Sequence, residues 1–355
     1  MPNASGYFHT RYSEDFALLE TRTQRTSFAV FIALLLILPF VARPLVIDLA
    51  SQVFLASIGA VALMLLTGFA GQISLGHAGL LAAGAFTAGI LFKEFAAPFW
   101  ITLPAAALTG ATLGLVFGLP SLRLRGLYLA VSTLGLYFVM HYLGMQYETK
   151  RGFSTGIVID PPSLGSWALA DPRAWYFVLL GFAAGSVLFS INLLRSRTGR
   201  AWKALRSNET VAEALGIHVA GYKLLAFVVS SAMTAIAGCL FAYYLGFVSI
   251  EAFSLYLSIQ YIAMAIIGGM GSILGALLGA VFVTIFPYMI EAATAVLPLP
   301  QRISEQVFAI NYIAFGVVMV VFLLFEPQGL VGIWRRIQNY FLLWPFRQTP
   351  LSGGK

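Results

Sequence analysis

Regularly spaced basic side chains are the feature of this sequence that most directly predicts a chemical role. Arg200, Lys203 and Arg206 recur at three-residue spacing within the segment 195–221, which reads RSRTGRAWKALRSNETVAEALGIHVAG. A helix through these residues would also carry an apolar side, made of Ala201, Trp202, Ala204 and Leu205. An amphipathic basic helix of this kind binds either an anionic lipid surface or a protein partner.

A second short helix is predicted directly after the first. Asn208 is a suitable N-cap, Glu209 follows in the first turn, and Gly216 is placed to end the helix. Long apolar runs precede and follow the whole segment. The segment is therefore predicted to be a polar, helical element at one face of a membrane protein, where a partner can push on it.

Two glycine-rich clusters are further candidates for a functional site. GFAGQISLGHAG from Gly68 to Gly79 and GGMGS from Gly268 to Ser272 interrupt apolar runs. Non-helical backbone at membrane depth is tolerated only inside protein or beside a water-filled cavity. Each cluster is interpreted as part of a translocation path or as a tight connection, and the second interpretation is favoured for GGMGS. The candidate path residues are Gly71, Gln72, Ser74, Gly76, His77, Gly268, Gly269 and Ser272.

His77 has two interpretations of its own. Beside Gln72 and Ser74, its imidazole could contact a polar substrate, but it could equally cap or pack the helix that follows. Capping or packing is the favoured interpretation.

The sequence predicts no metal site, no catalytic residue and no cofactor in this chain. Its four histidines show no ligand spacing such as H-E-x-x-H, and the phosphate loop G-x-x-x-x-G-K-[ST] is absent. Ionisable side chains collect at the ends of the apolar runs, whereas a proton-coupled transporter needs them in its interior. A transporter of this composition therefore takes its energy from a separate ATPase or is passive.

Composition places the chain in a membrane. Hydrophobic residues make up 59% of its 355 residues and charged residues only 10%, more apolar surface than a soluble fold can bury. The apolar runs approach the roughly 20 residues that cross a bilayer and predict an all-α bundle of about ten transmembrane helices. They lie at 27–47, 49–70, 77–97, 99–119, 126–147, 174–194, 222–248, 256–271, 272–291 and 305–326. The division of 256–291 into two spans rests on the GGMGS break alone.

Lysine and arginine orient this bundle. With the N-terminus inside, fifteen of the 21 basic residues fall in inner segments, in agreement with retention of positive charge in the cytoplasm. The net charge of +7 is therefore interpreted as topology and not as nucleic-acid binding. The prediction is a cytoplasmic segment 1–26, a membrane domain 27–326 that contains the cytoplasmic segment 195–221, and a cytoplasmic tail 327–355.

Small residues are predicted to organise the packing of the bundle. Two sets of glycines at four-residue spacing would let helix backbones approach closely: Gly110, Gly114 and Gly118, and Gly271, Gly275 and Gly279. Cys239, the only cysteine, lies inside an apolar run and is interpreted as a small buried side chain.

Seven longer stretches carry a family resemblance. They are GQISLGHAGLLAAGAFTAG at 71–89, RLRGLYLAVSTLG at 123–135, RTGRAWKALRSNETVAEALGI at 197–217, YKLLAFVVSSAMTAIAG at 222–238, GFVSIEAFSLYLSI at 246–259, IGGMGSILGALLGA at 267–280 and EPQGLVGIWRRI at 326–337. In this order they resemble the permease subunits of branched-chain amino acid ABC importers, of the LivM-like kind. The resemblance implies a multi-pass permease of a bacterial inner membrane, with a type II, BtuC-like arrangement as one option.

The resemblance also implies partners. The segment 197–217 would dock in a groove of ABC ATPase subunits, which would hold ATP and Mg. A second, LivH-like permease subunit would enclose the path, and a periplasmic substrate-binding protein would deliver the cargo. Coupling is thereby assigned to Arg197, Gly199, Arg200, Trp202, Arg206, Glu213, Ala214 and Gly216.

The sequence leaves the cargo open. Branched-chain or other apolar amino acids are favoured, and the alternatives on the same scaffold are urea or small amides and aromatic acids. A secondary transporter or channel is the alternative of a different class. It should carry an interior ion site and work without a partner.

Overall fold

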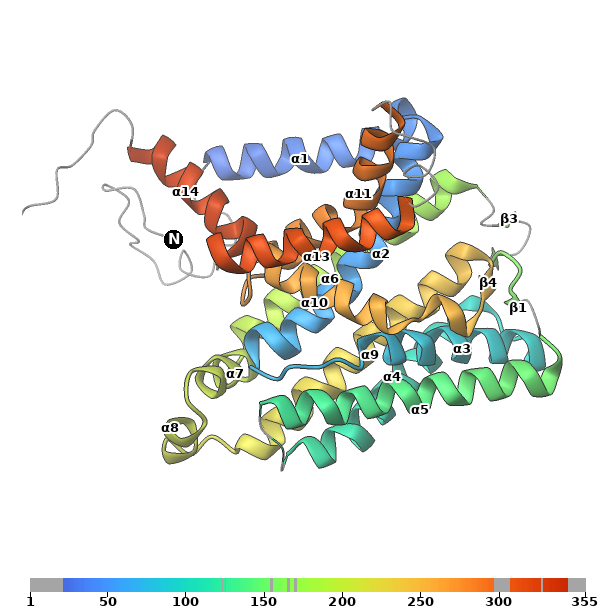
Figure 1. The fold of residues 1–355 in the computed structure, drawn as a ribbon, viewed down its shortest axis with the longest axis horizontal. Helices are drawn as coiled ribbons and strands as arrows, with labels where there is room; N and C mark the ends of the chain where they lie inside the picture. The colour runs from blue at the N-terminus through green and yellow to red at the C-terminus, as the bar shows by residue number, and fades with distance from the viewer. Residues whose placement is uncertain are drawn as a thin grey trace, which may run out of the picture.

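The computed structural model describes residues 22–343 except 123, 125, 154–155, 165–166, 169–170, 297–306 and 327, and it is almost entirely helical (Figure 1). The helices at the ten predicted spans are α1 (Arg22–Val41), α2 (Pro44–Leu63), α3 (His77–Phe95), α4 (Phe99–Ser121), α5 (Leu127–Arg151), α6 (Pro172–Arg195), α9 (Val219–Leu245), α10 (Leu255–Gly268), α11 (Ile273–Val296) and α13 (Val307–Phe325). The other elements are the π-helix η1 (Met64–Phe69), the 3-10 helix η2 (Ile250–Ala252), α7 (Arg197–Ser207), α8 (Glu209–Ala214), α14 (Gly329–Leu343) and the two-residue strands β1 (Ile157–Val158), β2 (Ser163–Leu164), β3 (Trp167–Ala168) and β4 (Phe247–Val248).

Eight helices of the described part of the chain are long and apolar enough to cross a membrane. They coincide with the second to ninth predicted spans, and the predicted helical membrane bundle is thereby confirmed. The helices at the first and tenth predicted spans, α1 and α13, do not meet this criterion singly. The last two helices, α13 and α14, are bent by 53° and count as a ninth span if they are taken as one.

The first predicted helix boundary, between 47 and 49, is wrong. The structure ends α1 at Val41 and starts α2 at Pro44. Proline is well suited to a first helical turn, because the N–H that it lacks would have no partner there. The chain from Pro44 to Phe69 then forms one continuous span of α2 and η1.

The GGMGS break does separate two helices, as predicted. Gly269 and Gly271 have φ values of +114° and +86°, which L side chains rarely adopt. The chain can therefore turn sharply between α10 and α11, which pack against each other on both sides of the turn.

Helix α9 lies at the centre of the bundle and packs against α2, α3 and α4. Gly110, Gly114 and Gly118 bring α4 against α9 so closely that an added Cβ would lie within 2.8 Å of an α9 atom at each. Gly275 and Gly279 bring α11 against α10 in the same way. Both predicted ridges are therefore confirmed except for Gly271, which lies in the turn. Cys239 is buried in α9, as predicted.

The two ends of the bundle differ in character. Helices α7, α8 and α14 lie at one end, and β1, β3 and β4 lie at the other (Figure 1). At the strand end, β1 pairs antiparallel with β4, with Ile157 opposite Val248. This pairing links the α5–α6 connection to the α9–α10 connection.

Candidate coupling and translocation site

Helix α7 is amphipathic, as predicted, and its apolar side is buried in the protein. Ala201, Trp202 and Leu205 are all buried against the rest of the chain. The helix packs on α6, α9 and η1, and the Trp202 indole N–H donates to the carbonyl of Tyr222 at 2.9 Å. The interpretation of α7 as a helix lying on lipid is therefore wrong, because protein already covers the side that would enter the bilayer.

The corner between α6 and α7 depends on Gly199. A Cβ at this position would lie 2.3 Å from both the Cα and the carbonyl oxygen of Leu194. No side chain fits at that distance. Gly199 therefore sets how closely α7 folds back on the end of α6, a role that its assignment to coupling did not anticipate.

Arg206 is exposed like the other basic residues of α7, but its guanidinium reaches back to the bundle. Its guanidinium donates a hydrogen bond to the carbonyl of Gly68 at the end of η1. A Cβ at Gly71 would lie 3.4 Å from the Cα of Arg206, and one at Gly271 would lie 2.1 Å from its Nη1. Arg206 thus touches both glycine-rich clusters at once.

The other basic residues of α7 also lie on its exposed side. Arg197, Arg200 and Lys203 are exposed, and the Arg200 guanidinium donates to the carbonyl of Arg195 at 3.1 Å. These three side chains form the outer basic surface of α7. They are free to meet an acidic partner.

Helix α8 begins and ends as the sequence predicts. The Asn208 side-chain oxygen accepts hydrogen bonds from the backbone N–H groups of Thr210 at 3.0 Å and Val211 at 3.2 Å. Gly216 has a φ of +81° and follows the last turn. Glu213, Ala214 and Gly216 are exposed, as an assignment to docking requires.

Two apolar side chains of this region were missed. Val211 is 54% exposed and Leu215 is 74% exposed, four positions apart at the tip of α8. Leu215 directly follows this six-residue helix, and no described part of the chain covers either side chain. Their spacing within an otherwise polar segment was the available signal.

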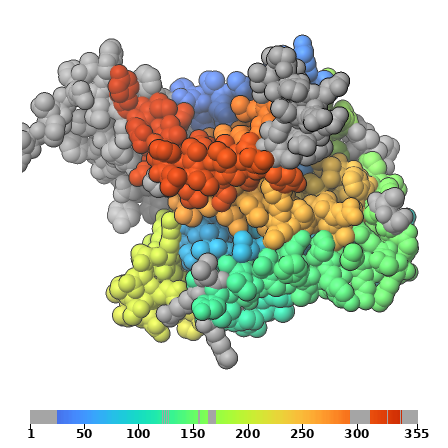
Figure 2. Space-filling model, viewed as in Figure 1, coloured from blue at the N-terminus to red at the C-terminus, as the bar shows by residue number. Residues whose placement is uncertain are grey.

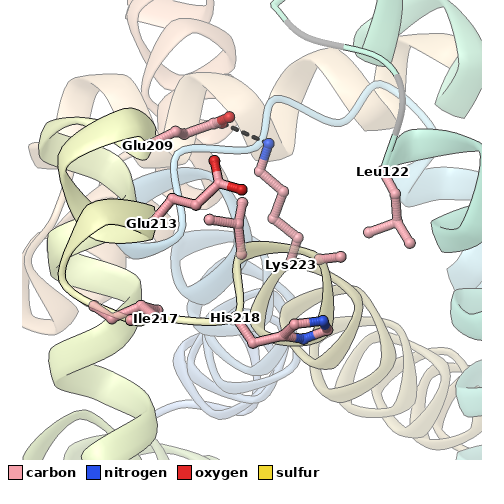
Figure 3. Close-up of a pocket in the computed structure, with 9 residues that line it drawn as sticks. Leu122, Glu209, Glu213, Ile217, His218 and Lys223 are labelled. Atoms are coloured by element: carbon pink, nitrogen blue, oxygen red, sulfur yellow. Dashed lines mark ion pairs between the residues drawn. The ribbon is translucent and has the colours of Figure 1, made fainter.

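A recess of about 420 Å³ lies between α8, the start of α9 and the end of α4 (Figure 3). The Lys223 ammonium enters it and pairs with the Glu209 carboxylate at 2.5 Å. Figure 3 shows Glu213 directed toward the same space, with Leu122 on the opposite wall. The pair attaches α8 to α9, and the Lys223 side chain is only 7% exposed. Among the described residues, no group of His, Cys, Asp or Glu is placed to hold a metal ion.

The first glycine-rich cluster forms an extended segment between η1 and α3. Its residues alternate: Gln72, Ser74 and Gly76 are buried, whereas Gly71 and Ile73 are exposed. The Gln72 amide donates to the carbonyl of Lys223 at 3.2 Å, and the Leu75 N–H donates to Thr133 Oγ1 at 2.9 Å. The polar candidates Gln72 and Ser74 therefore face the interior of this subunit.

His77 is a packing residue. It is 1% exposed, and its ring lies 4.7 Å from that of Tyr261. Gly76 occupies the N-cap of α3, and the first-turn N–H of Ala78 is satisfied by Ser258 Oγ of α10 at 2.9 Å and not by His77. The packing role expected for His77 is therefore confirmed, and the capping role is wrong.

The second cluster is a tight connection, the interpretation favoured for it. A Cβ on Gly268 would lie 1.9 Å from the carbonyl oxygen of Gly275. Ser272 Oγ accepts a hydrogen bond from the Gly275 N–H at 3.3 Å and so caps α11. Gly269 is buried and supplies the positive φ of the turn. These residues hold α10 against α11.

Comparison with known proteins agrees with this architecture. Residues 45–324 match the family described as branched-chain amino acid transport system / permease component. The chain belongs to this family. The match covers the span of α2 and η1, both glycine-rich clusters, and the helices α7 and α8.

Three relatives are 27–31% identical to this permease over the aligned residues. It is 31% identical to the high-affinity branched-chain amino acid transport system permease protein LivM of Salmonella typhimurium, over 84% of this chain and 72% of the relative. Identity to LivM of Escherichia coli is 30%, over 86% of this chain and 75% of the relative. The autoinducer 2 import system permease protein LsrC of Photorhabdus laumondii is 27% identical, over 68% of this chain and 62% of the relative. No solved structure matches the chain.

Proposed function

We propose that this chain is the permease subunit of an ATP-driven importer for branched-chain or other apolar amino acids. The observation that carries the proposal is the double attachment of α7 and α8. On one side they present Arg200, Lys203 and the apolar tip of α8. On the other side Trp202 and Arg206 bond to α9 and η1.

This attachment supports a route by which an ATPase moves the permease. A push on α8 or on the outer side of α7 reaches the first turn of α9 through Trp202. It reaches the end of η1 through Arg206, where the GGMGS turn also lies. Non-α-helical backbone bends more readily than an unbroken α-helix, so the movement is expected to concentrate there. ATP and Mg²⁺ would be held by the partner ATPases.

The proposed orientation puts the α7 end in the cytoplasm of a bacterium and the strand end outside its inner membrane. Arg195, Arg197, Arg200, Lys203, Arg335 and Arg336 lie at the α7 end of the described helices, and Arg43, Lys93, Lys150, Arg151 and Arg173 lie at the other. Positive charge is retained in the cytoplasm, which supports this assignment for both termini. A periplasmic binding protein would then meet the strand end, and a second, LivH-like permease subunit would pack beside the bundle.

The cargo is proposed from the relatives. Both LivM proteins are named as branched-chain amino acid permeases, and each combines at least 30% identity with at least 84% coverage of this chain. The autoinducer 2 permeases reach 31% identity over 50% of the chain or 93% coverage at 26% identity. Urea or small amides and aromatic acids are the other cargoes to be tested.

Reconstitution of the complete complex tests the proposal. The tagged chain is purified with its bound ATPase and second permease, inserted into liposomes, and supplied with binding protein and ATP. We expect uptake of labelled leucine that requires ATP hydrolysis and is blocked by excess isoleucine but not by urea or an aromatic acid. ATP-independent uptake would instead identify a secondary transporter or channel, and competition by urea or an aromatic acid but not by isoleucine would favour the corresponding alternative cargo.

A further inference from the structure

The segment Gly71–Leu75 has one edge that no part of the described chain covers. Gly71 is exposed, and the side chain of Ile73 is 42% exposed, while Gln72 and Ser74 between them are each only 2% exposed. Figure 2 shows surface of this part of the chain, in blue, between α10 in orange and α5 in green. The exposed edge is therefore a strip of backbone with small or apolar side chains.

This strip runs into the membrane-spanning part of the bundle. It starts beside Arg206 of α7 and ends at α3, which begins partway along the length of α5 (Figure 1). Leu75 bonds to Thr133, five residues inside the span that starts at Tyr128. At 1.5 Å per residue, the segment reaches about 8 Å into that span.

Two residues of the strip have backbone groups that the described part of the chain does not satisfy. Gly71 and Ile73 make no hydrogen bond, through N–H or C=O, with any other described residue. Helices and closed sheets satisfy these groups internally, and hydrocarbon offers no substitute. The exposed edge therefore does not face lipid tails and meets water or another polar surface.

We propose that the exposed edge of Gly71–Leu75 lines the water-filled path through which the cargo passes, an inference that rests on the proposed transport function. The strip is continuous with the α7 end, from which water can enter along it. Its free N–H and C=O groups can exchange hydrogen bonds with the carboxylate and ammonium groups of an amino acid. Ile73 offers an apolar contact to the side chain of the same cargo.

The proposal assigns opposite roles to alternate residues. Gln72 and Ser74 face away from the path, and Gln72 holds the strip against α9 through the carbonyl of Lys223. Gly71, Ile73 and Leu75 face the path. Path residues are thereby identified by their exposed backbone, and the polar side chains of the segment serve to hold it in place.

Thiol labelling tests this assignment, because Cys239 is fully buried and the chain has no other cysteine. The informative variant is Ile73→Cys, and Ser74→Cys is its buried neighbour. Leu188→Cys on α6 is the matched control, since Leu188 is 53% exposed within a candidate span but lies on an unbroken helix. Each variant is studied in the assembled complex in inside-out vesicles, with a charged, membrane-impermeant thiol reagent.

We expect Ile73→Cys to react about tenfold faster than Leu188→Cys or Ser74→Cys, because a thiol reacts as the thiolate, which forms in water and not in an apolar environment. Modification should also abolish leucine uptake when the labelled complex is reconstituted into proteoliposomes with binding protein and ATP. If Ile73→Cys reacts as slowly as Leu188→Cys, the strip is dry, whether lipid or a second subunit covers it, and the proposal is wrong. Labelling is measured without ATP, so that a failure of ATP-driven uptake and a failure of this assignment are distinguishable.

Discussion

Removal of the Arg206 guanidinium should separate ATP hydrolysis from transport. Its side chain is the contact between α7 and the carbonyl of Gly68, and it also lies against Gly271. In Arg206→Ala, α7 keeps the Trp202 bond to α9 but loses its bond to η1. An ATPase would still dock on α8 and the outer side of α7, but its movement would no longer reach the glycine-rich clusters directly.

The expected magnitude follows from the kind of bond that is lost. A hydrogen bond from a charged donor contributes about 1.5–3 kcal/mol, and the partial burial of this one places it at the lower end. At about 1.4 kcal/mol per factor of ten, uptake per ATP hydrolysed should fall about tenfold. Arg206→Lys should recover part of the lost uptake per ATP, because an ammonium keeps the charge but lacks the several planar N–H donors of a guanidinium.

The assay measures leucine uptake and ATP hydrolysis together in proteoliposomes that contain the full complex and binding protein. Arg335→Ala is the control, because Arg335 is an exposed basic residue on α14, outside the α7–α8 surface that the ATPase is proposed to meet. Uptake per ATP in this control should stay within about twofold of the unmodified complex, the usual size of a surface substitution. Equal ratios in the Arg206→Ala and unmodified complexes would refute the reasoning.

Three further predictions concern docking and packing. Leu215→Asp should abolish co-purification of the ATPase while leaving the permease in the membrane, since Leu215 is 74% exposed at the tip of α8; undiminished co-purification would exclude this tip from the interface. Gly199→Ala should lower stability by about 1–3 kcal/mol through overpacking, seen as a lower Tm of the detergent-solubilised complex, whereas Gly135→Ala, where an added Cβ meets nothing within 4 Å, should not. Lys223→Met should lower the stability of the complex by about 2 kcal/mol. This is less than the loss from breaking a fully buried ion pair, because the Glu209 side chain is 31% exposed. Adding Glu209→Gln to Lys223→Met should restore most of that loss in the same thermal assay, and a loss that persists would show that the pair is not its cause.

Several features of this protein follow from local patterns and were predictable from the sequence. Apolar runs of membrane length set the bundle, because each must leave water regardless of its neighbours. The start of α8 at Asn208 and its end at Gly216 follow from capping chemistry within a few residues. The glycines of α4 and α11 show their packing role through their spacing alone.

The first helix boundary could have been placed better from the same information. Pro44 marks the start of α2, but the apolar run continues through it, and hydropathy alone does not register the change of direction. The error at 47–49 therefore arose from weighing composition above backbone chemistry.

Only the tertiary structure decides what the side chains of α7 and the extended segment touch. The helical pattern places Arg206 on a basic side with Arg200 and Lys203, but its partner Gly68 is 138 positions away in the sequence. The bond of Gln72 to Lys223 crosses 151 positions. Periodicity states which residues share a side of an element and contains no information about what packs against that side.

The same limit explains the candidate path. The sequence by itself determined that GFAGQISLGHAG interrupts the bundle, because glycine-rich backbone is unfavourable in a continuous helix. It did not determine which residues of that segment face outward, since the alternation of buried and exposed positions depends on α5, α9 and α10 closing over one edge of the chain. Burial is a property of the assembled helices, and so the assignment of Ile73 to the path and of Ser74 to the interior came from the structure alone.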